Sequence, residues 1–172
     1  MRIEPFDPAL HERREFRCGH PALDDYLRRY ASQGQRHHLV RIYVALDDAD
    51  RVLGHYSLSA ASLSHAELPE ADARRLPRYP VPAVLIGRLA SDTGARQSGL
   101  RIGSRLLVHA LRQALRAAET IGVQCVIVDS KPDSADFYRR FGFVPLQREG
   151  LKLYLPIATI KKLDARDDLD GQ

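Results

Sequence analysis

Hydrophobic positions along the chain follow the period of helices in some segments and that of strands in others. Apolar residues at positions 23, 26, 27 and 30 have the i, i+3, i+4, i+7 spacing of an amphipathic helix, which predicts a helix over 20–33. The same spacing, sustained for longer, predicts a second helix over 102–118, with Gly122 placed to end it. A short helix is expected over 132–143, closed by Gly142.

Strand-like runs lie between these helices. Segments 39–48 and 51–63 are rich in β-forming residues and are joined by Asp48, Ala49 and Asp50, which predicts a hairpin. Nearly continuous apolar runs over 83–91 and 123–129 predict buried strands, and 151–158 predicts the last one. Four prolines between 67 and 82 predict mostly loop with one short helix. The order β-α-β-β-loop-β-α-β-α-β predicts an α/β (α+β) fold, a mixed sheet of six to seven strands flanked by helices.

Composition is that of one globular domain, which we expect over 1–163. The 172 residues are 44% hydrophobic and 28% charged. The acidic segment 164–172 is expected to be a disordered tail. Two cysteines far apart favour a reducing compartment. The N-terminus lacks a signal-peptide pattern and no apolar run reaches 18 residues, so a cytoplasmic protein without membrane contact is expected.

Positive charge is concentrated in the middle of the chain. Residues 73–117 contain nine arginines and one acid, a charge of +8 in a chain whose net charge is +4. Such a segment indicates a polyanionic partner, a phosphorylated cofactor or both; arginines on solvated helix faces are the plainer interpretation.

One loop in this segment has the pattern of an anion site. In ARQSGLRIGSRLL (95–107), two glycines directly precede the long helix. The first N–H groups of a helix lack partners, the helix dipole adds positive charge there, and glycines let a phosphate approach the backbone. A plain turn would also use glycines.

The loop resembles the pyrophosphate loop of the GNAT superfamily of N-acetyltransferases, Q/R-x-x-G-x-G/A. Residues 96–100 match, whereas Arg101 stands where Gly or Ala is expected; alternatively, Gly103 closes an expanded loop. A second match, DSADFYRRFGF, resembles the family segment A-x-x-F-Y-x-x-x-G-F. There the spacing predicts that Phe137, Phe141 and Phe143 face the core while Tyr138 is rotated off that stripe. A phenol can protonate the thiolate that leaves a thioester, so Tyr138 is the candidate acid.

Four blocks, over 16–33, 52–63, 76–92 and 133–143, resemble the acetyltransferase toxins of bacterial toxin–antitoxin pairs. This resemblance implies acetyl-CoA-dependent acetylation of the α-amine of aminoacyl-tRNA, which blocks translation. It also implies a homodimer, a ribbon-helix-helix antitoxin, and operator DNA bound only through the antitoxin complex. The coenzyme site implied by the resemblance and the loop comprises Leu89 and Ser91 for the pantetheine arm and, for the pyrophosphate, Arg96, Gln97, Ser98, Gly99, Leu100, Arg101, Gly103 and Ser104.

A tRNA substrate needs a basic surface, because phosphate neutralisation dominates such binding. The candidates are Arg74, Arg75, Arg78 and Arg88. Tyr56 and Tyr79 are candidates to stack on a base or aminoacyl group, and a place in the core is the alternative for each. No general base and no metal-ligand cluster is recognised. Two alternatives stay open, an N-acetyltransferase for a protein or small-molecule amine, and a non-catalytic RNA-binding or repressor-complex subunit.

Overall fold

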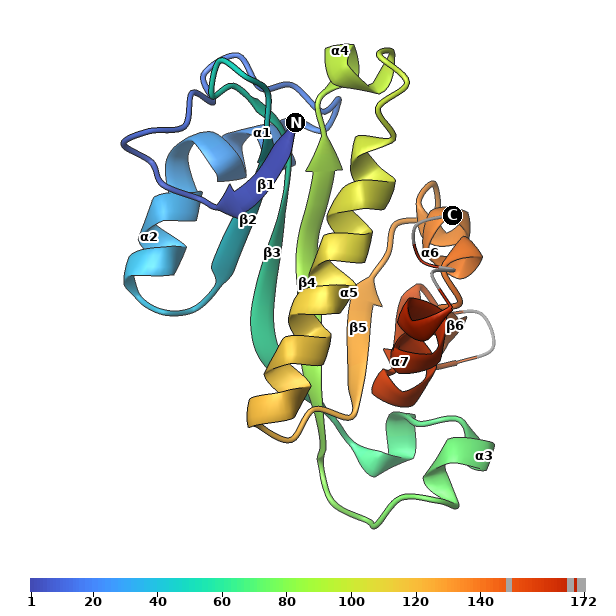
Figure 1. Ribbon diagram of the computed structural model, residues 1–172. Helices are drawn as coiled ribbons and strands as arrows, with labels where there is room; N and C mark the ends of the chain where they lie inside the picture. The colour runs from blue at the N-terminus through green and yellow to red at the C-terminus, as the bar shows by residue number, and fades with distance from the viewer. Residues whose placement is uncertain (148–149, 167–168, 170–172) are drawn as a thin grey trace. The chain divides into compact units, whose positions relative to one another are not determined.

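The computed structural model describes residues 1–147, 150–166 and 169. The strands are β1 (Arg2–Pro5), β2 (Arg41–Leu46), β3 (Val52–Leu63), β4 (Val81–Ser91), β5 (Cys125–Asp129), β6 (Val144–Pro145) and β7 (Lys152–Pro156) (Figure 1). The helices are α1 (Pro21–Asp25), the π-helical η1 (Tyr26–Tyr30), α2 (Ala31–Arg36), the 3-10 turn η2 (His65–Glu67), α3 (Glu70–Ala73), α4 (Thr93–Arg96), α5 (Ile102–Thr120), α6 (Ala135–Arg140) and α7 (Ile157–Ala165).

Hydrogen bonds join the strands into a mixed sheet of seven, in the order β1-β2-β3-β4-β5-β7-β6. β4 and β5 run parallel, whereas β1–β2, β2–β3, β5–β7 and β6–β7 are antiparallel pairs. The predicted mixed α/β sheet with flanking helices is therefore confirmed. The chain divides into two compact units, one of Met1–Ser59 and Gly87–Ala110, the other of Ala60–Ile86 and Leu111–Gln172.

In the first unit, β3 presents alternate side chains to opposite faces of the sheet, as the two-residue repeat of a strand requires. Tyr56 lies toward α5, where its hydroxyl makes a 2.6 Å hydrogen bond with Nδ1 of His109. His55 lies toward the other face, among the rings of Phe16 and Tyr26. On this second face the segment from α1 to α2 covers β2 and completes an apolar core.

The helix predicted over 20–33 contains an unpredicted π-helical turn. In η1 the Ala31 N–H donates to the carbonyl of Tyr26, five residues back. The extra residue in this turn shifts the helical register, since a π turn is wider than an α turn. Ala31 is consequently buried, whereas Tyr30, on the predicted apolar stripe, is 56% exposed.

In the second unit, β5 pairs with β4 and β7, and α7 follows β7 directly. α7 was not among the predicted elements. It reaches Ala165, and its Asp164 accepts a 2.8 Å hydrogen bond from Nε of Arg112 on α5. The predicted boundary at 163 therefore falls inside a helix, and Leu169 is buried. Residues 167–168 and 170–172 of the predicted tail lie outside the described residues.

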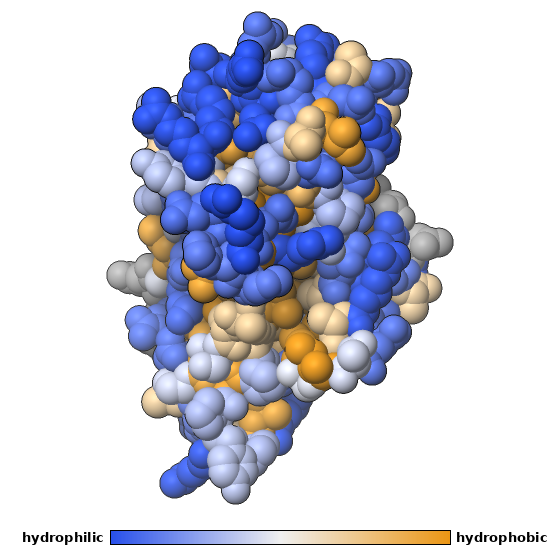
Figure 2. All heavy atoms as spheres, turned by 90° about the vertical axis from the view of Figure 1, so that its left-hand side faces the viewer, coloured by the Kyte–Doolittle hydropathy of each residue, from blue (hydrophilic) through white to orange (hydrophobic). Residues whose placement is uncertain are grey.

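Hydrophilic residues predominate on the face seen in Figure 2, with hydrophobic ones interspersed among them. Among the described helices, none is long and apolar enough to cross a bilayer.

Candidate active site

The passage from β4 into α5 is built by a short helix and two left-handed residues. Asp92 caps α4, because its carboxylate accepts hydrogen bonds from the N–H groups of Gly94 (2.9 Å) and Ala95 (3.2 Å). Gly99 has φ +73° and Arg101 has φ +48°. Glycine adopts this backbone region at least cost. Arg101 thus holds a backbone conformation that glycine adopts more readily.

The start of α5 is open to an anion. Gly99 is exposed, and nothing lies within 4 Å of the place that a Cβ would occupy. The N–H of Arg105 donates to the carbonyl of Arg101 at 3.1 Å, while the N–H groups before it stand at the helix N-terminus, where a helix offers no acceptor of its own. Gly103 lies inside α5 and not in the loop.

Two of the predicted coenzyme residues contact each other. Nε of Arg96 donates to Oγ of Ser91 at 3.1 Å, and Nη2 donates to the carbonyl of Cys18 at 2.9 Å. These bonds fasten α4 to the end of β4 and to the segment that precedes α1. The Arg96 side chain therefore has a structural role, and the backbone of the loop is the better candidate for phosphate.

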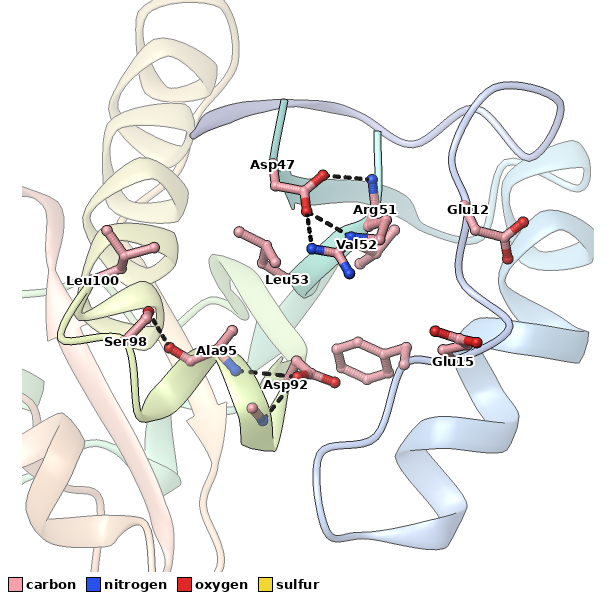
Figure 3. A pocket seen from close by; sticks show the side chains of 12 residues that line it. Glu12, Glu15, Asp47, Arg51, Val52, Leu53, Asp92, Ala95, Ser98 and Leu100 are labelled. Carbon is pink, nitrogen blue, oxygen red and sulfur yellow. Dashed lines mark hydrogen bonds and ion pairs between the residues drawn. The ribbon is translucent and has the colours of Figure 1, made fainter. Parts of the chain in front are cut away.

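A cavity of about 440 Å³ lies on one side of α4 (Figure 3). Gly94, Ala95 and Ser98 line it, but so do four carboxylates, those of Glu12, Glu15, Asp47 and Asp92. The cation in the lining, Arg51, is paired with Asp47 at 2.7 Å. Carboxylates of this number repel a pyrophosphate, so the coenzyme phosphates are not expected in this cavity.

Tyr138 on α6 is held by other aromatic rings. It is 7% exposed and packs against Phe137 (centroids 5.1 Å apart) and Phe143 (5.7 Å). Phe141 and Phe143 are buried as predicted, but Phe137 is only half-buried and Tyr138 is the more buried of the adjacent pair. Burial raises the pKa of Tyr138 to about 12, so the phenol stays protonated at neutral pH.

The segment 65–78 contains η2, α3 and the three arginines Arg74, Arg75 and Arg78, and hydrogen bonds of η2 and α3 hold it in place. Nε2 of His65 lies 2.9 Å from the carbonyl oxygen of Ala73. Two further contacts tie the segment to β7: the Tyr154 hydroxyl donates to Asp72, and Nζ of Lys152 donates to Glu67 at 2.9 Å. All three arginines are exposed, although Arg74 is paired with Glu70.

The two tyrosines that were predicted to stack on substrate differ in exposure. Tyr56 is fully buried, and its ring stacks on Tyr43 with centroids 5.2 Å apart. It belongs to the core, so its predicted contact with a base is wrong. Tyr79, beside Arg78, is 72% exposed. Only Tyr79 stays a stacking candidate.

Arg88 is exposed on β4, and its guanidinium lies over the ring of Tyr26, 3.9 Å from the ring centroid. No local pattern in the sequence indicates this pair, since 62 positions separate the two residues. The role of Asp92 was also missed, although an Asp between a strand and a glycine-containing turn is a typical helix-cap signal.

Both cysteines, Cys18 and Cys125, are buried and unbridged. Burial raises the pKa of Cys18 to about 11 and that of Cys125 to about 12, so both thiols stay protonated and unreactive at neutral pH. The described residues contain no group of three or more His, Cys, Asp or Glu side chains placed to hold a metal ion.

Comparison with known proteins finds relatives along almost the whole chain. The "Probable toxin TacT" of Sinorhizobium fredii is 33% identical over 171 residues, covering 94% of this chain and 93% of the relative. The "tRNA-acetylating toxin" of Mycobacterium tuberculosis is 37% identical over 149 residues, covering 86% of this chain and 87% of the relative. No model of a protein family matches the chain.

Solved structures of similar proteins superpose on this chain over almost its whole length. AtaT complexed with acetyl-methionyl-tRNAfMet superposes with a TM-score of 0.85 at 26% identity, covering 95% of this chain and 98% of that one. A Tyr-to-Phe mutant of AtaT, bound to the C-terminus of the antitoxin AtaR and to acetyl-CoA, gives 0.79 at 25% identity and covers 95% and 97%. The AtaT–AtaR complex bound to DNA gives 0.77 at 27% identity and covers 95% and 99%.

The fold and the loop before α5 define a GNAT-type N-acetyltransferase. Within that class, the chain belongs to the family of tRNA-acetylating toxins that includes these relatives.

Proposed function

We propose that this protein transfers the acetyl group of acetyl-CoA to the α-amine of aminoacyl-tRNA and so blocks translation. The observation that carries the proposal is the likeness, over 95% of the chain, to AtaT complexed with acetyl-methionyl-tRNAfMet. A substrate of the translation machinery also favours a cytoplasmic protein.

In the proposed reaction the neutral amine attacks the thioester carbonyl and a C–N bond forms. The tetrahedral intermediate collapses, the C–S bond breaks, and the sulfur leaves with the electron pair. Tyr138 donates its phenolic proton to that sulfur, the amine loses a proton to water, and the phenolate regains a proton from solvent. Tyr138 is protonated at neutral pH, so its proton is present before the sulfur becomes negative.

The coenzyme is proposed to extend along the end of β4, with backbone groups at Leu89 and Ser91 pairing with the pantetheine arm. The pyrophosphate then meets the N–H groups of residues 97–104. The left-handed backbone of Arg101 supports the register in which it replaces the family's glycine. Gly103 and Ser104 act from within the first turn of α5.

The acceptor tRNA is proposed to contact Arg74, Arg75, Arg78 and Arg88, all of which are exposed. We further propose an acetyltransferase domain that extends from residue 1 through α7, a homodimer, and a ribbon-helix-helix antitoxin that bridges the toxin to operator DNA. The AtaT–AtaR complex bound to DNA supports the antitoxin and DNA partners.

The test is incubation with labelled acetyl-CoA and total aminoacyl-tRNA, with deacylated tRNA and a lysine-containing peptide as matched acceptors. Label is expected on the α-amine of the aminoacyl group alone. Label on the peptide with none on tRNA would instead assign the enzyme to protein amines, and no thiol release with any acceptor would mean a non-catalytic protein.

A further inference from the structure

The exposed guanidinium of Arg88 is supported by a ring from a distant part of the chain. Its Cζ lies 3.9 Å from the centroid of the Tyr26 ring, where the electron-rich face attracts a cation. Tyr26 is itself buried, and its hydroxyl makes no hydrogen bond within the described part of the chain. The ring face therefore supports Arg88, and the Arg88 charge also acts on the hydroxyl, where it opposes the rise of the Tyr26 pKa caused by burial.

Two more rings continue the stack behind Tyr26. His55 lies beside it with centroids 6.3 Å apart and ring planes 28° apart, and Phe16 meets His55 edge-on at 5.2 Å. His55 is 0% exposed, and within the residues the structure describes neither of its ring nitrogens has a hydrogen-bond partner. Because burying unpaired polar atoms costs free energy, an imidazole at this position requires an explanation beyond stability.

In the group formed by Arg88, Tyr26 and His55, the imidazole is neutral and Arg88 is the cation. Burial lowers the pKa of His55 to about 4, the Arg88 charge acts in the same direction, and the Asp24 carboxylate opposes both. A neutral imidazole supports the Tyr26 ring without repelling the guanidinium in front of it.

We propose that Tyr26 and His55 are positioning residues, which hold the Arg88 guanidinium in one orientation for a phosphate at the 3′ end of the acceptor tRNA. This inference rests on the proposed function. A planar guanidinium binds phosphate through two parallel N–H···O bonds, and a side chain that is already fixed loses less conformational freedom on binding. Arg88 directly precedes Leu89, so a phosphate bound there brings the terminal amine toward the coenzyme.

The experiment is a double-mutant cycle, read as the KM for aminoacyl-tRNA and separately as the KM for acetyl-CoA. Arg88→Ala is expected to raise the tRNA KM about tenfold. Tyr26→Leu, which leaves Arg88 in place, should raise it about fivefold, and the double variant should be no worse than Arg88→Ala alone, since the two residues act through one contact. The KM for acetyl-CoA should stay within about twofold throughout.

Conservative variants separate positioning from packing and from bulk charge. Tyr26→Phe keeps the ring and should retain the wild-type KM, whereas Arg88→Lys keeps the charge, loses the planar fork and should stay impaired. His55→Leu should raise the tRNA KM about threefold if the imidazole aligns Tyr26. Arg14→Ala removes another exposed cation of the same unit and should change nothing.

Additive effects of Arg88→Ala and Tyr26→Leu on the tRNA KM would overturn the positioning role. A wild-type tRNA KM in Arg88→Lys would overturn it too, and this variant provides the test if Tyr26→Leu does not fold. An unchanged tRNA KM in Arg88→Ala would remove Arg88 from the tRNA site while acetylation itself remained measurable. Failure of the wild type to acetylate aminoacyl-tRNA would instead reject the proposed function, and the inference with it.

Discussion

The Tyr138 region and the loop before α5, which have different roles in the proposed reaction, are built in opposite ways. Tyr138 is buried, and the rings of Phe137 and Phe143 pack against it. The loop is exposed from Gln97 through Arg101, and its conformation depends on two left-handed residues and the Asp92 cap.

The difference corresponds to two kinds of chemical task. A proton donor acts only at the moment when charge develops on sulfur, so its oxygen must be fixed in advance and kept protonated. A pyrophosphate site acts in the ground state, where backbone N–H groups must be reachable from solvent. Variants of the first region should therefore lower kcat, and variants of the second should raise the coenzyme KM.

The largest effect is expected for Tyr138→Phe, which removes one oxygen and keeps the ring. Turnover should fall by about 10² to 10⁴, while the KM for both substrates changes much less. In cells without antitoxin, the wild type should arrest growth and the variant should be tolerated at equal expression. Undiminished toxicity would mean that Tyr138 is structural. Thermal unfolding of the variant serves as the control, because Tyr138 is part of the core.

Gly99→Glu tests the opposite region. The substitution places a side chain and a negative charge at a left-handed, exposed position of the proposed anion site. Acetyl-CoA binding, measured by calorimetry, should weaken at least about tenfold, with kcat at saturating coenzyme nearly unchanged. Wild-type affinity in a folded variant would exclude this loop as the pyrophosphate site.

Replacement of Arg74, Arg75 and Arg78 with alanine should affect neither kcat nor coenzyme binding. It should weaken tRNA binding and flatten the dependence of log K on log salt, by about 0.7 for each phosphate that is no longer neutralised. Binding measured across a salt series provides the test, with Arg14→Ala as a charge control. An unaltered slope would place the tRNA elsewhere or indicate a small acceptor.

Arg101→Gly should produce a gain of at most about threefold in acetyl-CoA affinity, because glycine adopts the left-handed backbone of this position without strain. Calorimetry on the same coenzyme titration checks this. A large loss of affinity would instead show that the Arg101 side chain itself binds phosphate.

The smallest effect is expected for alkaline pH, where kcat should not change through ionisation of Tyr138. The folded pKa of Tyr138 is raised to about 12, so the phenol remains protonated as pH rises from about 7.5 to about 10, and kcat should show no alkaline decline due to this group. Measurement of kcat across that range, for the wild type and Tyr138→Phe, checks it. A decline near pH ~9 that Tyr138→Phe abolishes would contradict the burial of the phenol in the active enzyme.

The local pattern of the sequence alone determined the positions of several helices and strands. Helical spacing located α5 within two residues, because the partition of side chains between core and water repeats with the period of a helix. Runs of β-forming residues located β2 and β3, and a nearly continuous apolar run located β4. Gly142, with φ +88°, ends α6 as predicted, since a left-handed turn is a requirement of the local backbone.

The tertiary structure decided the rest. A π turn moved Tyr30 out of the apolar stripe, and burial removed Tyr56 from the substrate candidates. Asp164, predicted to begin the tail, lies in α7 and accepts a hydrogen bond from Arg112. Above all, the stack of Arg88 on Tyr26 and His55 joins three positions that no local pattern connects. Such contacts depend on which strands pair and in what register, and a one-residue slip of β3 or β4 would turn His55 or Arg88 to the opposite face of the sheet.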